Sequence, residues 1–378
     1  MSQAYQHVKY LAEEIGPRGS CTAQERKAAE YIKAQLVKMG FEPKWEQFKA
    51  VTSFSWAFGL IYLFFVIAAF IYPSSPYLGF IITFLAFLGF YFETNTFPLF
   101  SKLIPKKSSQ NIIAEVPARS KAIRNVIIMA HYDSSRSALS FSPKMVKNFR
   151  TTYLLMVVAM GLQVFFYALG VFSSLPQQLL WIFSLPSAIY LAFTLFLLIH
   201  RELFGEYTPG ANDNASGVAV LLEVAKVLAR FPLLTTTVTL VATGAEESGT
   251  NGALDFLRRH QPSKETFIIN LDNLGSGNLT AITHEGILGT KPSSPELLSL
   301  AEHTVEEKNL KLKFLPYNLL TTDGTVFIKR KYPVMTVMAF DQEGLLPNWH
   351  WPTDRAEFVK PENLEDAKEL VLGIIRKL

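Results

Sequence analysis

The sequence predicts an α/β protein, a three-layer sandwich with a mostly parallel central sheet that two transmembrane helical hairpins interrupt. Three observations predict it. Apart from four long apolar stretches, the chain alternates between short strand-like runs and helical segments, which is typical of a sheet covered by helices. The excess of phenylalanine concentrates in the four apolar stretches. Acidic residues and histidines directly follow several of the strand-like runs.

The first half of the chain contributes one predicted helix and three predicted strands to the sandwich. The helix spans residues 22–39, where Thr22 is a candidate N-cap and Glu25 completes a capping box three residues later. The strands are predicted at residues 44–51, 111–116 and 125–130. The last of them (NVIIMA) is apolar throughout and ends at His131.

The second half continues the alternation. Helices are predicted at residues 217–228, 249–260, 294–308 and 361–378, and strands at residues 236–242, 267–271 and 334–340. Ligands of such sheets bind outside the carboxyl ends of the strands. The polar residues that follow the strands are therefore expected to converge on one edge of the sheet.

The four apolar stretches are predicted to cross a membrane. Each is close to the roughly 20 residues that span a bilayer core, and none shows the polar face of an ordinary core helix. They lie at residues 54–72, 77–92, 152–172 and 179–199. The predicted domains are therefore a first transmembrane hairpin at 54–99, a second at 151–200, and one soluble domain formed by 1–53, 100–150 and 201–378.

Basic residues predict the orientation of the hairpins. The turn within each hairpin carries no charge, whereas the opposite ends are flanked by Lys49, Lys102, Lys106, Lys107, Lys144, Lys147, Arg150 and Arg201. By the positive-inside rule, both chain ends and the soluble domain of this multi-pass protein are expected on the cytoplasmic side. The lipid bilayer is thus a predicted partner. No basic stripe interleaved with aromatic residues indicates nucleic-acid binding.

Seven residues at or near the strand ends form the candidate site. They are His131 and Asp133 in HYDS, Asp213 in GANDNASG, Glu246 and Glu247 in TGAEES, Asp272 in LDN and His350 in NWHWPTD. Imidazole and carboxylate groups are the donors that hold hydrolytic zinc ions. Cys21 is the only cysteine, which excludes an internal disulfide and a cysteine-rich metal site.

Taken singly, some of these residues have ordinary explanations. His131 could be a core histidine, and Asp213 could be a turn residue that bonds its own backbone. Asp133 suits a supporting role, in which it accepts the second imidazole N–H of His131.

The adjacent glutamates are harder to explain without a metal. Glu246 and Glu247 would repel each other at a buried strand end unless a cation compensates them. One of them can ligate a metal while the other takes a proton from metal-bound water. His350 lies between Trp349 and Trp351, and apolar surroundings favour the neutral imidazole that binds metals.

In this order, the motifs resemble the M28 family of dinuclear zinc aminopeptidases. The match covers nearly all of the soluble part, and GANDNASG and the double glutamate are its most specific segments. The resemblance implies a zinc exopeptidase-like fold and a metallopeptidase that hydrolyses the N-terminal bond of a peptide substrate. It also implies two Zn²⁺ ions: His131 and Asp272 would hold one, Glu247 and His350 the other, and Asp213 would bridge them.

The resemblance assigns catalytic roles as well. Glu246 would be the general base and then the acid that protonates the leaving amine, while Asp133 would orient His131. Asp323, in TTDGTVF, falls where the family often has a substrate-pocket segment.

One feature departs from the soluble relatives, in which the interval between the first histidine motif and the GANDNASG turn is short. Here about 80 residues separate His131 from Asp213, and the second hairpin lies between them. We therefore expect the catalytic cleft to lie close to the membrane surface. A site so placed could favour hydrophobic peptides or substrates that arrive from the membrane.

Three alternatives remain. One is a mono-zinc acyltransferase resembling the glutaminyl cyclases, and another is a non-catalytic receptor or scaffold domain of the same fold. The third is a transporter built from the four helices, which is disfavoured because the helices carry almost no ionisable residues. The sequence makes no prediction of the oligomeric state.

Overall fold

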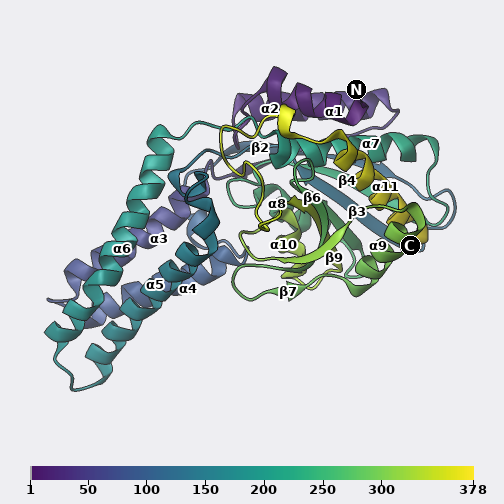
Figure 1. The fold of residues 1–378 in the computed structure, drawn as a ribbon. Coiled ribbons are helices and arrows are strands. Elements are labelled where there is room, and N and C mark those ends of the chain that lie inside the picture. Colours follow the sequence, from purple (N-terminus) through teal and green to yellow (C-terminus); the bar gives the residue numbers. More distant parts are fainter. Residues whose placement is uncertain (1) are drawn as a thin grey trace. The chain divides into compact units, whose positions relative to one another are not determined.

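The computed structural model describes residues 2–378, and the chain folds into two units (Figure 1). The first, which we call the sheet unit, comprises Met1–Thr52, Lys106–Ser137 and Glu206–Leu378. The second, which we call the helical unit, comprises Ser53–Pro105 and Ala138–Gly205. The helical unit therefore also takes in residues 53, 100–105, 138–150 and 201–205, which the predicted boundaries assign to the soluble domain.

One mixed sheet forms the centre of the sheet unit. Across the described residues its nine strands are β1 (Lys44–Ala50), β2 (Lys107–Val116), β3 (Arg124–His131), β4 (Thr236–Thr243), β5 (Phe267–Leu271), β6 (Asn278–Glu285), β7 (Lys291–Pro292), β8 (Lys313–Tyr317) and β9 (Val334–Phe340). They are ordered β1-β2-β4-β3-β5-β9-β6-β7, and β8 pairs with β6.

The sheet is mixed: it is parallel at its centre, as predicted, and also between β6 and β8. Strands β4, β3, β5 and β9 run parallel to one another. The pairs β1–β2, β2–β4, β6–β9 and β6–β7 are antiparallel. Strand β6 lies beside β9, and the short connection from β5 contains no helix that would carry the chain back along the sheet, so β6 runs opposite to β5 and β9.

Helices cover both faces of the sheet. On β3, Val126, Ile128 and Ala130 belong to the larger hydrophobic core, whereas Ile127 and Met129 belong to a second core on the opposite face. The larger core is covered by α1 (Gln3–Lys9), α2 (Ala23–Lys38), α7 (Ser216–Arg230), α9 (Pro295–Lys308) and α11 (Pro361–Lys377). The second core is covered by α8 (Asn251–His260) and α10 (Asp323–Ile328). The sheet and the helices on its two faces therefore form three layers.

Helix α2 begins as its sequence predicts, with one difference. The Thr22 hydroxyl accepts the backbone N–H of Glu25 at 3.2 Å, as an N-cap does. The Glu25 carboxylate accepts the N–H of Cys21 at 3.0 Å rather than that of Thr22. Only half of the predicted capping box is therefore present, because the Glu25 carboxylate binds the residue before the N-cap instead of the N-cap itself.

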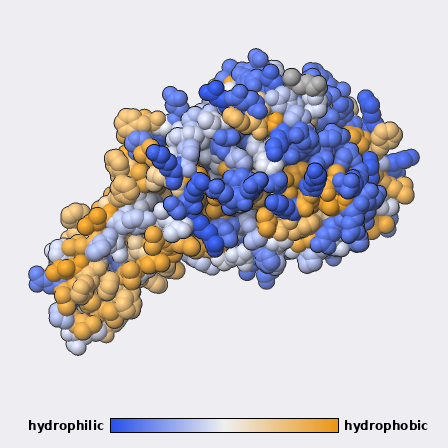
Figure 2. Space-filling view, viewed as in Figure 1, coloured by the Kyte–Doolittle hydropathy of each residue, from blue (hydrophilic) through white to orange (hydrophobic). Residues whose placement is uncertain are grey.

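The helical unit contains four long helices. They are α3 (Phe54–Ile71), α4 (Pro76–Thr94), α5 (Phe149–Phe172) and α6 (Gln177–Phe204). All four are long and apolar enough to cross a membrane. Large apolar side chains face outward, among them Phe70, Phe172 and Ile189, and Figure 2 shows hydrophobic residues gathered over this unit.

Candidate metal centre

The ends of the parallel strands supply most of the candidate site. His131 is the last residue of β3, the glutamate pair follows the end of β4 at Thr243, and Asp272 follows directly on β5. Because β4, β3 and β5 are parallel neighbours, these residues share one edge of the sheet. Asp213 reaches the same place from the turn before α7, and His350 from the loop between β9 and α11.

Asp213 lies at the centre of the site. Its Oδ1 atom is 3.2 Å from Nε2 of His131, and its Oδ2 atom is 3.2 Å from Nε2 of His350. One carboxylate therefore contacts two imidazoles with two different oxygens. The peptide bond that follows Asp213 is cis.

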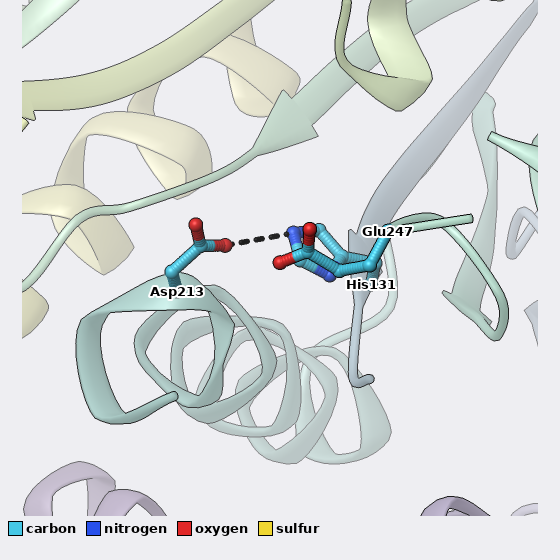
Figure 3. Close-up of side chains that lie close together, drawn as sticks. All are labelled: His131, Asp213 and Glu247. Carbon is cyan, nitrogen blue, oxygen red and sulfur yellow. Dashed lines mark ion pairs between the residues drawn. The ribbon is translucent and has the colours of Figure 1, made fainter. Parts of the chain in front are cut away.

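Each histidine has a second carboxylate beside it. Nε2 of His131 is 3.6 Å from Oδ1 of Asp272, and Nε2 of His350 is 3.2 Å from Oε2 of Glu247. Ligand atoms of His131, Asp213 and Glu247 all lie within 4.8 Å of one another, and Figure 3 shows these three side chains pointing toward a common point. The structure thus brings together the five residues predicted to bind metal.

The composition of this cluster fits zinc. All five residues are buried, and Oε1 of Glu247 is a buried atom without a hydrogen-bond partner in the described part of the chain. Buried carboxylates of this kind require compensating positive charge. Burial alone would lower the pKa of His350, but the Glu247 and Asp213 carboxylates raise it to about 9. In the metal-free protein, protons on the imidazoles therefore supply the charge that Zn²⁺ would provide.

The general-base candidate, Glu246, is buried next to this cluster. Burial raises the pKa of its carboxyl well above the ordinary value, the positive charge of His131 opposes this, and Asp323 and Glu247 raise it further. Such a carboxylate has a stronger affinity for a proton than an exposed one, which suits a group that must accept and return a proton.

Asp133 holds the backbone that carries the two glutamates. Its carboxylate accepts the N–H of Glu246 at 3.0 Å and that of Glu247 at 3.1 Å. Nδ1 of His131 is 3.6 Å from Oδ1 of Asp133 and 3.2 Å from its backbone carbonyl oxygen. The nearest acceptor for the imidazole is therefore the Asp133 backbone, while the carboxylate contacts the glutamate turn.

Two further carboxylates support the site, and sequence reasoning missed the first of them. Asp354, in the PTD that follows His350, accepts the N–H of Asn212 at 2.7 Å and that of Asp213 at 3.0 Å. The short PTD motif was the only signal for it. Asp323, at the start of α10, is fully buried, and its carboxylate accepts the hydroxyl of Thr243 at the end of β4.

Comparisons with known proteins agree with this fold. Residues 198–375 match the sequence profile of peptidase family M28. The chain is 28% identical to aminopeptidase YwaD from Bacillus subtilis (strain 168) over 182 residues, which cover 45% of this chain and 38% of that protein. The match thus spans less than half the length of this relative.

Solved structures resemble the whole chain. BSAP, a zinc aminopeptidase from Bacillus subtilis, superposes with a TM-score of 0.60 at 18% identity, covering 99% of this chain and 94% of that one. Bacteroides thetaiotaomicron glutaminyl cyclase bound to N-acetylhistamine gives 0.58 at 15% identity, covering 100% and 97%. The fold is that of the zinc aminopeptidases. The part of the chain that matches the M28 profile carries Asp213, Glu246, Glu247, Asp272 and His350.

Proposed function

We propose that the chain is a membrane-bound dinuclear zinc aminopeptidase. The observation that carries this proposal is the position of the Asp213 carboxylate, with one oxygen toward His131 and the other toward His350. A carboxylate placed in this way is suited to bridge two metal ions. His131 with Asp272 would hold one ion, and His350 with Glu247 the other.

The chemistry of the reaction divides between the metals and the chain. Zn²⁺, when bound, lowers the pKa of a coordinated water and polarises the scissile carbonyl. Glu246 accepts the proton of the attacking water on a carboxylate oxygen and returns it to the nitrogen of the leaving amine. Asp133 keeps Glu246 in place through the backbone hydrogen bond described above.

The charge of the site supports cleavage at a free N-terminus. Besides the metal-ligand candidates, the carboxylates of Glu246 and Asp323 are buried near the cluster. A peptide ammonium group would be held by carboxylates near the metals. A blocked N-terminus would lack this interaction, which favours an aminopeptidase over an endopeptidase.

We also propose that the four helices span the membrane, with the sheet unit on the cytoplasmic side and the catalytic cleft close to the bilayer. The length and hydropathy of the helices support this proposal. Helix α6 ends at Phe204, only nine residues before Asp213. Since an extended chain spans at most about 3.6 Å per residue, Asp213 lies within roughly 30 Å of the end of α6. Hydrophobic peptides are the substrates expected of such a site.

A glutaminyl cyclase-like acyltransferase with one zinc ion is the second candidate, and the likeness to the Bacteroides enzyme supports it. A cyclase of this kind would require one metal site rather than two. The number of bound zinc ions therefore separates the two candidates.

Peptide hydrolysis by the full chain in detergent tests the proposed activity. Peptides with free and with acetylated N-termini are compared, using wild type and Glu246→Ala. We expect only the free peptide to be cleaved, and we expect kcat to fall by about 10²–10⁴-fold in the variant because the proton carrier is lost. Glu265→Ala, which removes an exposed glutamate of the sheet unit, should retain wild-type kcat. Equal kcat in wild type and Glu246→Ala, or cleavage of the acetylated peptide, would contradict the proposal.

A further inference from the structure

The segment that contains the start of α2 contacts the backbone of three parts of the metal centre. We call residues 16–25 the N-terminal brace. It lies more than 100 residues from His131 in the sequence. Three of its side chains, Arg18, Ser20 and Glu25, are buried and directed toward the site, although none of them is placed to bind a metal ion.

Arg18 joins the two chain segments that carry the histidine and the bridging aspartate. Its Nε donates to the carbonyl oxygen of Tyr132, next to His131, at 2.6 Å. Its Nη2 donates to the carbonyl of Gly210 at 2.6 Å and its Nη1 to that of Pro209 at 2.5 Å, just before Asp213. The guanidinium is fully buried. Its planar, forked geometry allows one side chain to satisfy carbonyls on both segments.

Ser20 and Glu25 hold the third segment, the glutamate turn. The Ser20 hydroxyl donates to Oδ2 of Asp133 at 2.6 Å, and the same carboxylate accepts the N–H groups of Glu246 and Glu247. Oε1 of Glu25 accepts the N–H of Ala245 at 2.9 Å. Ala245 has a φ of 52°, a left-handed conformation that a non-glycine residue adopts only when its surroundings stabilise it.

The brace also contacts the place where the chain leaves and re-enters the sheet unit. Residues 134–137 and 206–208 run side by side, with Ser137 N–H donating to Glu206 at 2.8 Å and Thr208 N–H to Ser135 at 2.8 Å. We call residues 134–137 and 206–208 together the insertion ribbon. Gly19 packs so closely against it that a Cβ atom on Gly19 would lie 1.9 Å from the Tyr207 ring. The ribbon connects the insertion 138–205 directly to the segments bearing His131 and Asp213.

We propose that the N-terminal brace is the positioning element of the metal centre: Arg18, Ser20 and Glu25 fix the backbone at His131, Asp213 and the glutamate pair. Arg18 also binds the carbonyls of Tyr132, Pro209 and Gly210, which lie just outside the two segments that lead to the insertion. This inference rests on the proposed metal site. Removing a group that orients a metal ligand through a hydrogen bond typically lowers the metal affinity by about 10–100-fold.

Zinc affinity of the folded protein tests the brace. Chelator competition is measured on full-length wild type, Arg18→Lys and Ser20→Ala, after circular dichroism shows that each is folded. A lysine ammonium cannot bind the same set of carbonyls, so we expect zinc affinity to fall by about 10–100-fold in Arg18→Lys and by about tenfold in Ser20→Ala. The visible absorption of bound Co²⁺ should change in both variants, since it reports ligand geometry. If Arg18→Lys does not fold, Ser20→Ala decides the test.

Arg201→Lys is the matched control, because Arg201 is a buried arginine of the helical unit that donates to Ser53 and Ser55. Its zinc affinity and Co²⁺ spectrum should equal those of wild type. Wild-type affinity and an unchanged spectrum in folded Arg18→Lys and Ser20→Ala would overturn the brace and leave the proposed function intact. A wild-type protein that binds no zinc would instead overturn the proposed function.

Discussion

The Asp213 carboxylate contacts two histidines, and each histidine contacts a further acid. In the metal-free protein, this arrangement is held together by protons: burial opposes ionisation of Asp213, yet hydrogen bonds from His131 and His350 lower its pKa below the ordinary range. Metal binding must displace these protons, so the affinity for zinc should rise with pH.

Asp323 gives the zinc-free protein a separate dependence on pH. Burial raises its pKa from 3.8 to about 7. Because the folded state has the higher pKa, the stabilising contribution is complete below about pH 3.8 and is lost as the pH rises through about 7. We expect urea denaturation to show a larger loss of stability between about pH 5 and 8 in wild type than in Asp323→Asn, by on the order of 1–3 kcal/mol.

Asp341→Asn provides the control, since it changes a loop carboxylate that accepts the N–H groups of Glu343 and Leu345. Its loss of stability over the same pH interval should equal that of wild type. If Asp323→Asn also behaved like wild type, the titration of Asp323 would not be the cause.

The sequence could predict a site residue only where the residues around it form a recognisable motif. The ligand candidates occur in short motifs at strand ends and in neighbouring turns and loops, so the sequence alone could predict them. Arg18 and Glu25 act on the backbone of residues more than 100 positions away. Such contacts depend on the three-dimensional path of the chain, so local sequence patterns do not predict them.

At the scale of elements, strong periodicity decided what could be predicted. The apolar strand β3 and the four long helices have the expected type and nearly the expected ends. Strands β6, β7 and β8 were missed: β6 contains polar residues throughout (NLTAITHE), β7 has only two residues, and β8 (KFLPY) includes a proline. Proline is tolerated only at the edge of a sheet, and the position of β8 became clear only from its pairing with β6.

The helical hairpins carry a prediction of their own. Ser74 lies in the exposed turn between α3 and α4, and Lys121 is an exposed residue of the sheet unit. In a Cys21→Ser background, we expect a membrane-impermeant maleimide to label Ser74→Cys on intact cells, because this turn would face away from the cytoplasm. Lys121→Cys should react only after the membrane is permeabilised.

Two outcomes would contradict this orientation. Labelling of Lys121→Cys on intact cells would place the sheet unit on the outer side. Failure of both variants to react before permeabilisation would argue against helices that span the membrane.

At the scale of the whole molecule, the metal centre and the insertion are connected by very short segments. His131 and Asp213 lie on either side of residues 138–205, and the ribbon at 134–137 and 206–208 joins them to it. The order of the motifs made the fold predictable despite this interruption. The closeness of the cleft to the membrane remains a prediction based on the length of the connecting chain.

The number of zinc ions per chain is a direct test of the proposed dinuclear site. The full-length protein is purified in detergent, freed of loosely bound metal and measured by inductively coupled plasma mass spectrometry against protein concentration. We expect two zinc ions per chain, because Asp213 faces two separate histidine–carboxylate sets. One zinc ion per chain would contradict the dinuclear site and favour the cyclase-like alternative, and no bound zinc would contradict the metal centre itself.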